Sequence, residues 1–239
     1  MNLKKNIILL LTLSFLISCS GDKKELEQVS ISGTTMGTTY SIKIVSDKPE
    51  VEKVDSELIQ NEVDSILIAV NQEMSTYIPD SEISLFNKHK STEWFTISKD
   101  FANVLEMSLY ISQKSAGAFD ITVGPLVNLW GFGPDYKLEY VPTQKEIDMG
   151  LLSVGYNNVF VIAEPPSIKK KIKDIYIDLS AIAKGFGVDK VSEYLDTKRI
   201  NNYMVEIGGE VRTKGKNIKD KEWQIGISTP DGGSDLQRV

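Results

Sequence analysis

The feature that most constrains this chain is residues 175–189, where a compact apolar run leads through an acid and small residues into a helical pattern. The β-branched and aromatic side chains of the run predict a short strand. Ser180 is a possible N-cap, and apolar residues at roughly helical spacing from Ile182 to Leu195 predict a helix after it. A helix N-terminus presents unpaired N–H groups and the positive end of the helix dipole, so this point suits a phosphate group.

Two charged residues flank the predicted helix start. Lys184 would add a mobile cation, and Asp178, at the strand exit, is placed to bind a metal or a ligand hydroxyl or amide. Gly185 and Gly187 fall inside the predicted helix, where each costs about 1 kcal/mol relative to alanine. Either they let another part of the backbone pack closely, or a bulky ligand lies against them. Spacing alone slightly favours packing, because no G-x-G-x-x-G or Walker pattern is present.

The amino-acid composition indicates a globular protein and argues against several classes of function. The chain has 239 residues, 41% of them hydrophobic and 25% charged, which is typical of a globular protein of one large or two small domains. A net charge of −6 argues against a nucleic-acid partner. His89 is the single histidine, so a Ser/His/Asp or Cys/His mechanism and a histidine-based zinc site are not expected.

The N-terminus has the pattern of an export signal. Lys4 and Lys5 precede an apolar stretch, which predicts a signal peptide over residues 1–18. The sequence Leu-Ile-Ser-Cys ending at Cys19 resembles a bacterial lipobox, which predicts a lipidated (palmitate-bearing) Cys19; a chance cysteine after an ordinary signal peptide is the alternative. Residues 19–29 then form a polar tether, and the protein is expected to be a membrane-anchored lipoprotein on the periplasmic side of the inner membrane. Cys19 is the only cysteine, so no internal disulfide is expected.

Periodicity predicts the remaining elements. Helices are expected over residues 51–70, 81–86, 98–114 and 144–152, and strands over residues 40–44, 202–207 and 223–227. The basic residues 169–173 are expected to form a solvated hairpin turn. Hairpin-like strands and helices mix without steady βα alternation, so we expect an α+β fold with a mixed or antiparallel sheet and flanking helices.

Three further features could contact a ligand. Residues 117–134 combine glycines, aromatics and little charge, so they are either buried between elements or line an apolar pocket. Met36, in the turn before the first predicted strand, is either a soft apolar contact for a ligand or simply core. Tyr77 could stack on an aromatic ligand, although a lone tyrosine before a turn is more often a packing residue.

Five stretches, taken in order behind the lipobox, resemble one family, the bacterial FAD:protein FMN transferases of the ApbE type. The stretches are GTTMGT at 33–38, MSTY with DSE at 74–82, GAFDITVGP at 117–125, IDLSAIAKG at 177–185 and EIGGE at 206–210. The likeness covers residues 30–239. Members of the family continue further, with segments that carry most of the metal ligands, so the resemblance implies a flavin transferase domain that is C-terminally incomplete.

The resemblance also implies a reaction and a site. The family cleaves the diphosphate of FAD, passes FMN to a threonine hydroxyl of a target such as a membrane redox-complex subunit, and releases AMP. Asp178 and Lys184 are implied as catalytic residues, and Mg²⁺ is implied to bind partly at Ala181, where only a backbone carbonyl can serve. The implied FAD contacts are Met36, Tyr77, Ala118, Phe119, Asp120, Asp178 and Lys184. Hydrolysis of FAD to FMN and AMP, and flavin binding without chemistry, remain as alternatives.

Overall fold

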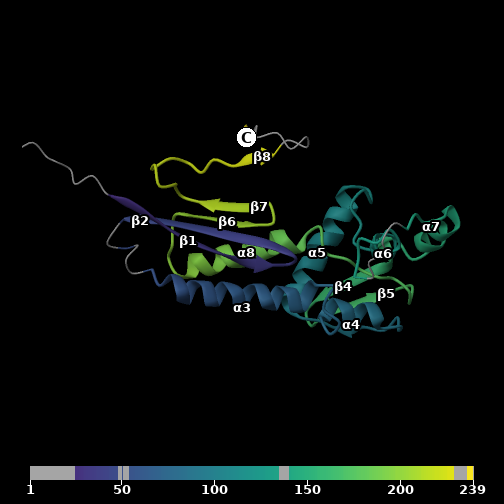
Figure 1. Ribbon diagram of the computed structural model, residues 1–239. Helices are drawn as coiled ribbons and strands as arrows, with labels where there is room; N and C mark the ends of the chain where they lie inside the picture. Colours follow the sequence, from purple (N-terminus) through teal and green to yellow (C-terminus); the bar gives the residue numbers. More distant parts are fainter. Residues whose placement is uncertain (1–24, 48–49, 51–53, 135–139, 229–235, 239) are drawn as a thin grey trace, which may run out of the picture.

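The computed structural model describes residues 25–47, 50, 54–134, 140–228 and 236–238 (Figure 1). The predicted signal peptide and Cys19 lie outside these residues. Strand β1 (Leu26–Thr35) begins within the segment 19–29 that was expected to be a tether. In the ranges that the structure describes, no helix has the length and apolar character needed to cross a membrane.

The larger sheet has four antiparallel strands in the order β1-β2-β6-β7. The strands are β1, β2 (Thr38–Asp47), β6 (Tyr203–Ile207) and β7 (Glu210–Lys214). The predicted alternation in β2 is confirmed, because Tyr40, Ile42 and Ile44 are all buried. Helices α3 (Ser56–Met74) and α8 (Ala183–Thr197) run beneath this sheet and share one hydrophobic core with it (Figure 1).

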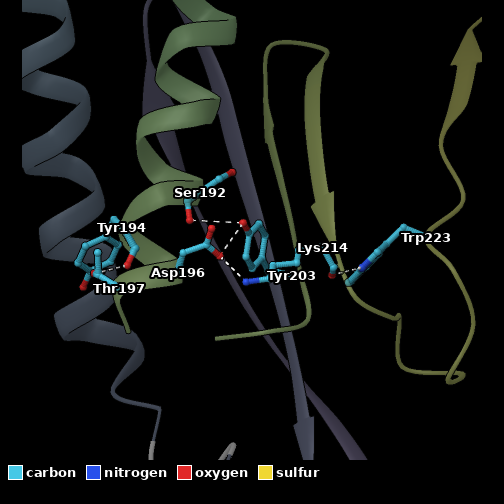
Figure 2. Close-up of polar contacts among 7 residues, drawn as sticks. All are labelled: Ser192, Tyr194, Asp196, Thr197, Tyr203, Lys214 and Trp223. Carbon is cyan, nitrogen blue, oxygen red and sulfur yellow. Dashed lines mark hydrogen bonds and ion pairs between the residues drawn. The ribbon is translucent and has the colours of Figure 1, made fainter. Parts of the chain in front are cut away.

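A polar cluster ties the end of α8 to the sheet (Figure 2). The Tyr203 hydroxyl donates to Asp196 Oδ1 at 3.1 Å, and Lys214 Nζ donates to the same oxygen at 2.9 Å. The Lys214 ammonium and the Tyr203 hydroxyl lower the pKa of the Asp196 carboxyl. Trp223 Nε1 donates to the Lys214 carbonyl at 3.0 Å, so the chain after β7 is attached to the same cluster.

The second part of the fold contains a three-stranded antiparallel sheet in the order β3-β5-β4. The strands of this sheet are β3 (Phe95–Thr96), β5 (Pro166–Lys170) and β4 (Val159–Ala163). The other helical elements are α4 (Glu82–Lys88), α5 (Lys99–Lys114), α6 (Gly124–Leu129), α7 (Gln144–Leu151) and η1 (Tyr156–Asn158). The last two strands of the chain are β8 (Gly226–Ser228) and β9 (Leu236–Arg238). The expected α+β class, with antiparallel sheets and flanking helices, is confirmed.

Local helix signals were accurate. Ser81, Ser98 and Thr143 cap α4, α5 and α7, and Thr143 forms the complete capping box with Glu146. The helix predicted over residues 51–70 corresponds to α3, and its residues 51–53 lie outside those that the structure describes. It begins at Ser56 because the Asp55 carboxylate caps it, and it continues to Met74.

Residues 175–178, predicted to form a strand, are not part of either sheet. Ile175, Ile177 and Leu179 are fully buried, so the apolar run is a core segment. Ser180 does not cap α8, because the helix begins at Ala183 and no side chain caps it. The Ser180 N–H instead donates to Asp178 Oδ1 at 2.7 Å, an Asx-type turn that captures this amide before the helix starts.

Of the basic residues 169–173, Lys171 and Lys173 are exposed in a turn, as expected, whereas Lys169 and Lys170 belong to β5. Lys170 is the last residue of β5 and is fully buried, because strand alternation turns it inward with Ile168. The hairpin between β4 and β5 turns earlier, around Glu164 and Pro165.

Candidate ligand site

The tip of the β1–β2 hairpin meets the start of α8. Met36 and Gly37 form the hairpin turn with φ angles of +49° and +71°. A Cβ on Gly187 would lie 3.2 Å from Met36 Cε, so the hairpin tip lies directly against α8. Met36, Phe119 and Phe186 all pack, half-buried, against the same core cluster. Met36 and Phe119, which the resemblance implies as FAD contacts, thus pack against one core cluster although they are far apart in the sequence.

Asp178 joins this group through its main chain. Its N–H donates to the Ile121 carbonyl at 2.8 Å, so the turn that leads into α8 lies beside the segment that holds Phe119 and Asp120. Both carboxylate oxygens of Asp120 already accept hydrogen bonds from the protein. Its Oδ1 accepts from the Thr122 N–H at 2.8 Å and its Oδ2 from the Tyr156 N–H at 2.9 Å. The Asp120 carboxylate thus braces the loop around it, and a ligand would share it with those amides.

Lys184, in the first turn of α8, points to the turn between β6 and β7. Its Nζ lies 2.9 Å from Glu210 Oε1 and 3.4 Å from the Gly208 carbonyl oxygen. The other carboxylate oxygen, Glu210 Oε2, is buried and has no hydrogen-bond partner among the described residues. Buried carboxylate oxygens are normally paired, so this one marks a place where a donor is missing.

Sequence reasoning did not assign Glu210 a role. Its signals were its position directly after Gly208 and Gly209 and its place in the EIGGE stretch at 206–210 that carries the resemblance. Both glycines have positive φ, +55° and +100°, so the two strands are joined by a tight turn that delivers Glu210 to Lys184.

A cavity of about 650 Å³ opens beside this ion pair, within the range that holds drug-sized ligands. Its walls include Ala181, Gly185, Phe186, Glu210 and Met107 of α5. A Cβ on Gly185 would meet nothing within 4 Å, whereas one on Gly187 would meet three side chains. Of the two interpretations of these glycines, close packing therefore holds for Gly187, while Gly185 faces open space.

Of the predicted site residues, Ala181 lines this cavity, and Tyr77 and Ala118 do not. Tyr77 is 63% exposed, and its hydroxyl donates to the Phe132 carbonyl at 3.0 Å, which links the turn after α3 to the loop after α6. Ala118 is exposed next to Phe119. The predicted apolar segment 117–134 is partly helical, since α6 occupies its middle, and it supplies both Phe119 and Phe132.

A second cavity, of about 440 Å³, lies between the end of β2, the start of α3 and the end of α8. None of the predicted site residues lines it.

The residues that the structure describes fit Mg²⁺ only in part. Ala181 is exposed and lines the larger cavity, and it can offer one backbone carbonyl, a suitable ligand for a hard cation. No three His, Cys, Asp or Glu side chains of the described ranges come together as a metal site. This donor set is incomplete, so no chemical step is assigned to a metal here.

Fold and site together define a class of protein: an α+β domain with a half-apolar cavity, a lysine at its edge and a helix start beside it, suited to a partly anionic organic ligand. The ApbE family model matches residues 36–239, and the chain belongs to the ApbE family.

Similar proteins agree with this assignment. A Vibrio cholerae protein named FAD:protein FMN transferase is 45% identical over 221 residues, which is 92% of this chain and 65% of that protein. A Haemophilus influenzae protein of the same name is 43% identical over 231 residues, 95% of this chain and 66% of its own. This chain therefore spans just under two-thirds of the length of these relatives.

Solved structures show the same fold. Flavin transferase ApbE from Vibrio cholerae superposes with a TM-score of 0.83 at 44% identity, covering 89% of this chain and 68% of that one. The apo form of the flavinyl transferase ApbE from Pseudomonas stutzeri gives a TM-score of 0.78 at 30% identity, covering 85% and 66%.

Proposed function

We propose that this chain is the flavin-binding part of an FAD:protein FMN transferase. The reaction breaks the diphosphate bond of FAD, forms a bond between the FMN phosphorus and a threonine oxygen of a target protein, and releases AMP and the threonine proton. The observation that carries the proposal is that the hairpin tip with Met36 lies against α8, the helix of Lys184, while the turn before α8 is bonded through the Asp178 N–H to the segment that holds Phe119. The names of the relatives support it.

Each of these residues has a physical task in the proposal. Met36 and Phe119 offer half-buried apolar surface to the flavin ring. Lys184 neutralises negative charge on the diphosphate, after exchanging Glu210 for the ligand. Asp178 holds the turn before α8 through the Ser180 N–H, and a carboxylate has further lone pairs with which to accept from a ligand.

Mg²⁺ is part of the proposal through the family resemblance. When bound, it would neutralise charge on the transferring phosphoryl group. Ala181 would contribute its carbonyl to the ion, and the described residues supply no complete set of ligands.

The cellular setting is also proposed. Lipidation at Cys19 would anchor the protein on the periplasmic side of the inner membrane, within reach of threonine-bearing subunits of membrane redox complexes. Mass spectrometry of the N-terminal peptide from the membrane fraction tests this. An unmodified Cys19, or a Cys19→Ser variant that stays in the membrane fraction, would contradict the anchor.

The activity is tested by incubating the chain with FAD, Mg²⁺ and a threonine-bearing acceptor peptide. Transfer gives a covalently fluorescent peptide and one AMP per flavin attached. Free FMN with AMP would favour the hydrolase, and bound FAD without AMP would favour a binding protein. EDTA is expected to abolish AMP release while a matched reaction with excess Mg²⁺ restores it.

A further inference from the structure

The segment that carries Asp178 is held by side chains instead of by a neighbouring strand. Asn87, at the end of α4, accepts from the Ile177 N–H through Oδ1 at 2.8 Å and donates to the Ile177 carbonyl through Nδ2 at 2.9 Å. Asn87 is only 7% exposed. One amide side chain thus makes both hydrogen bonds that a strand partner would make to this residue.

Lys170 supports the same segment from the other side. Its Nζ donates to the Ile175 carbonyl at 3.1 Å and to the Phe86 carbonyl at 3.2 Å, and the side chain is fully buried. The ammonium also lies 4.8 Å from the centroid of the Phe86 ring. Asn87 and Lys170 therefore connect α4 and β5 to residues 175–177.

Burying the Lys170 ammonium group costs free energy, because the charge is removed from water. Burial lowers the pKa of the Lys170 amine to about 8, with the nearby Lys90 ammonium lowering it further and the Asp174 carboxylate opposing both. An apolar side chain of similar length would avoid this cost. The lysine is therefore better explained by what it orients than by what it stabilises.

We propose that Asn87 and Lys170 are positioning residues, which fix residues 175–178 and thereby set the position of Asp178 and of the turn that carries Ala181 into the wall of the larger cavity. This inference rests on the proposed function, because it takes FAD as the ligand. The Asp178 N–H bond to the Ile121 carbonyl connects the same segment to the loop that holds Phe119.

Lys170→Met separates positioning from plain stabilisation. Methionine keeps most of the volume and removes the buried charge, while the Ile175 carbonyl loses its donor. The two effects offset each other, so the midpoint of urea unfolding should change little. A residue that only stabilises the core would instead lose stability and ligand affinity together.

The experiment measures hydrogen exchange of residues 175–181 and the dissociation constant of FAD. For Lys170→Met we expect about tenfold faster exchange in this segment and about tenfold weaker FAD binding, with a retained cooperative unfolding transition. Asn87→Ala should show the same two changes and serves if the first variant does not fold. Lys169→Met is the matched control, because Lys169 lies over the Trp94 and Phe160 rings, outside the segment's contacts.

Unchanged exchange in residues 175–181, or faster exchange with unchanged FAD affinity, would overturn the proposal. A wild-type chain that does not bind FAD would contradict the proposed function instead. The exchange comparison between Lys170→Met and Lys169→Met would then still decide whether these side chains fix the segment.

Discussion

At the scale of single residues, the site is built from side chains that already have partners within the protein. Lys184 pairs with Glu210, and Asp120 accepts from the neighbouring Thr122 N–H and from the Tyr156 N–H of η1. An anionic ligand must therefore replace Glu210 at the Lys184 ammonium. Because the Lys184 and Glu210 side chains are 30% and 39% exposed, solvent screens the pair and the exchange should not be costly.

Lys184→Met tests this residue directly. The variant should bind FAD about tenfold more weakly, because one charge-assisted contact to the diphosphate is lost, and its unfolding midpoint should barely change. Isothermal titration with FAD measures the affinity. Lys190→Met is the matched control on the same helix, since Lys190 pairs with Asp100 at 2.8 Å. Equal losses in the two variants would show a general effect of charge on α8.

At the scale of elements, the sequence predicted what is decided locally. The helix caps Ser81, Ser98 and Thr143 act within a few residues of themselves, so their pattern is visible in the chain. The segment at 175–178 was mistaken for a strand because its partner, Asn87, is separated from Ile177 by 90 positions. Lys170 was taken as solvated because its charge outweighed the strand alternation that buries it.

The two glycines of α8, Gly185 and Gly187, should respond differently to substitution by alanine. Gly185→Ala should raise the free energy of unfolding by about 1 kcal/mol, since the new methyl group meets no atom within 4 Å. The same methyl group projects toward the cavity, so FAD affinity should fall. Urea unfolding and FAD titration measure the two effects.

Gly187→Ala is the comparison, since its Cβ would press on Met36, Leu67 and Ile207. It should gain less stability than Gly185→Ala or lose some. A Gly185→Ala variant with unchanged FAD affinity would show that the ligand does not reach this side of the helix.

At the scale of the whole molecule, charged groups from the four helices α3, α4, α5 and α8 influence one another. Burial raises the pKa of the Glu73 carboxyl on α3 to about 7, and the Asp100 and Glu82 carboxylates add to this, while Ser98 and Lys190 oppose it. Lys190 belongs to α8 and Asp100 to α5, so the packing of α3, α5 and α8 depends on the charge at this point.

The protein should therefore lose stability as the pH rises from about 4.5 to about 7. In this window the folded state keeps the Glu73 proton that the unfolded chain has released, so raising the pH favours unfolding. Glu73→Gln lacks this dependence, and its stability advantage over the wild type should grow across the window. Urea unfolding at a series of pH values measures the difference. Glu106→Gln, an exposed site on α5, is the control, and parallel pH curves for Glu73→Gln and wild type would contradict the prediction.

The strand order β1-β2-β6-β7 has a consequence for how the chain is made. The β1–β2 hairpin can close as soon as it has been synthesised, but the other edge of β2 stays uncovered until Val205 pairs with Ile42. During that interval an apolar strand edge is open to other nascent chains. The unfinished chain would then depend on holdase chaperones to avoid aggregation. Slowing synthesis between these strands should therefore increase aggregation.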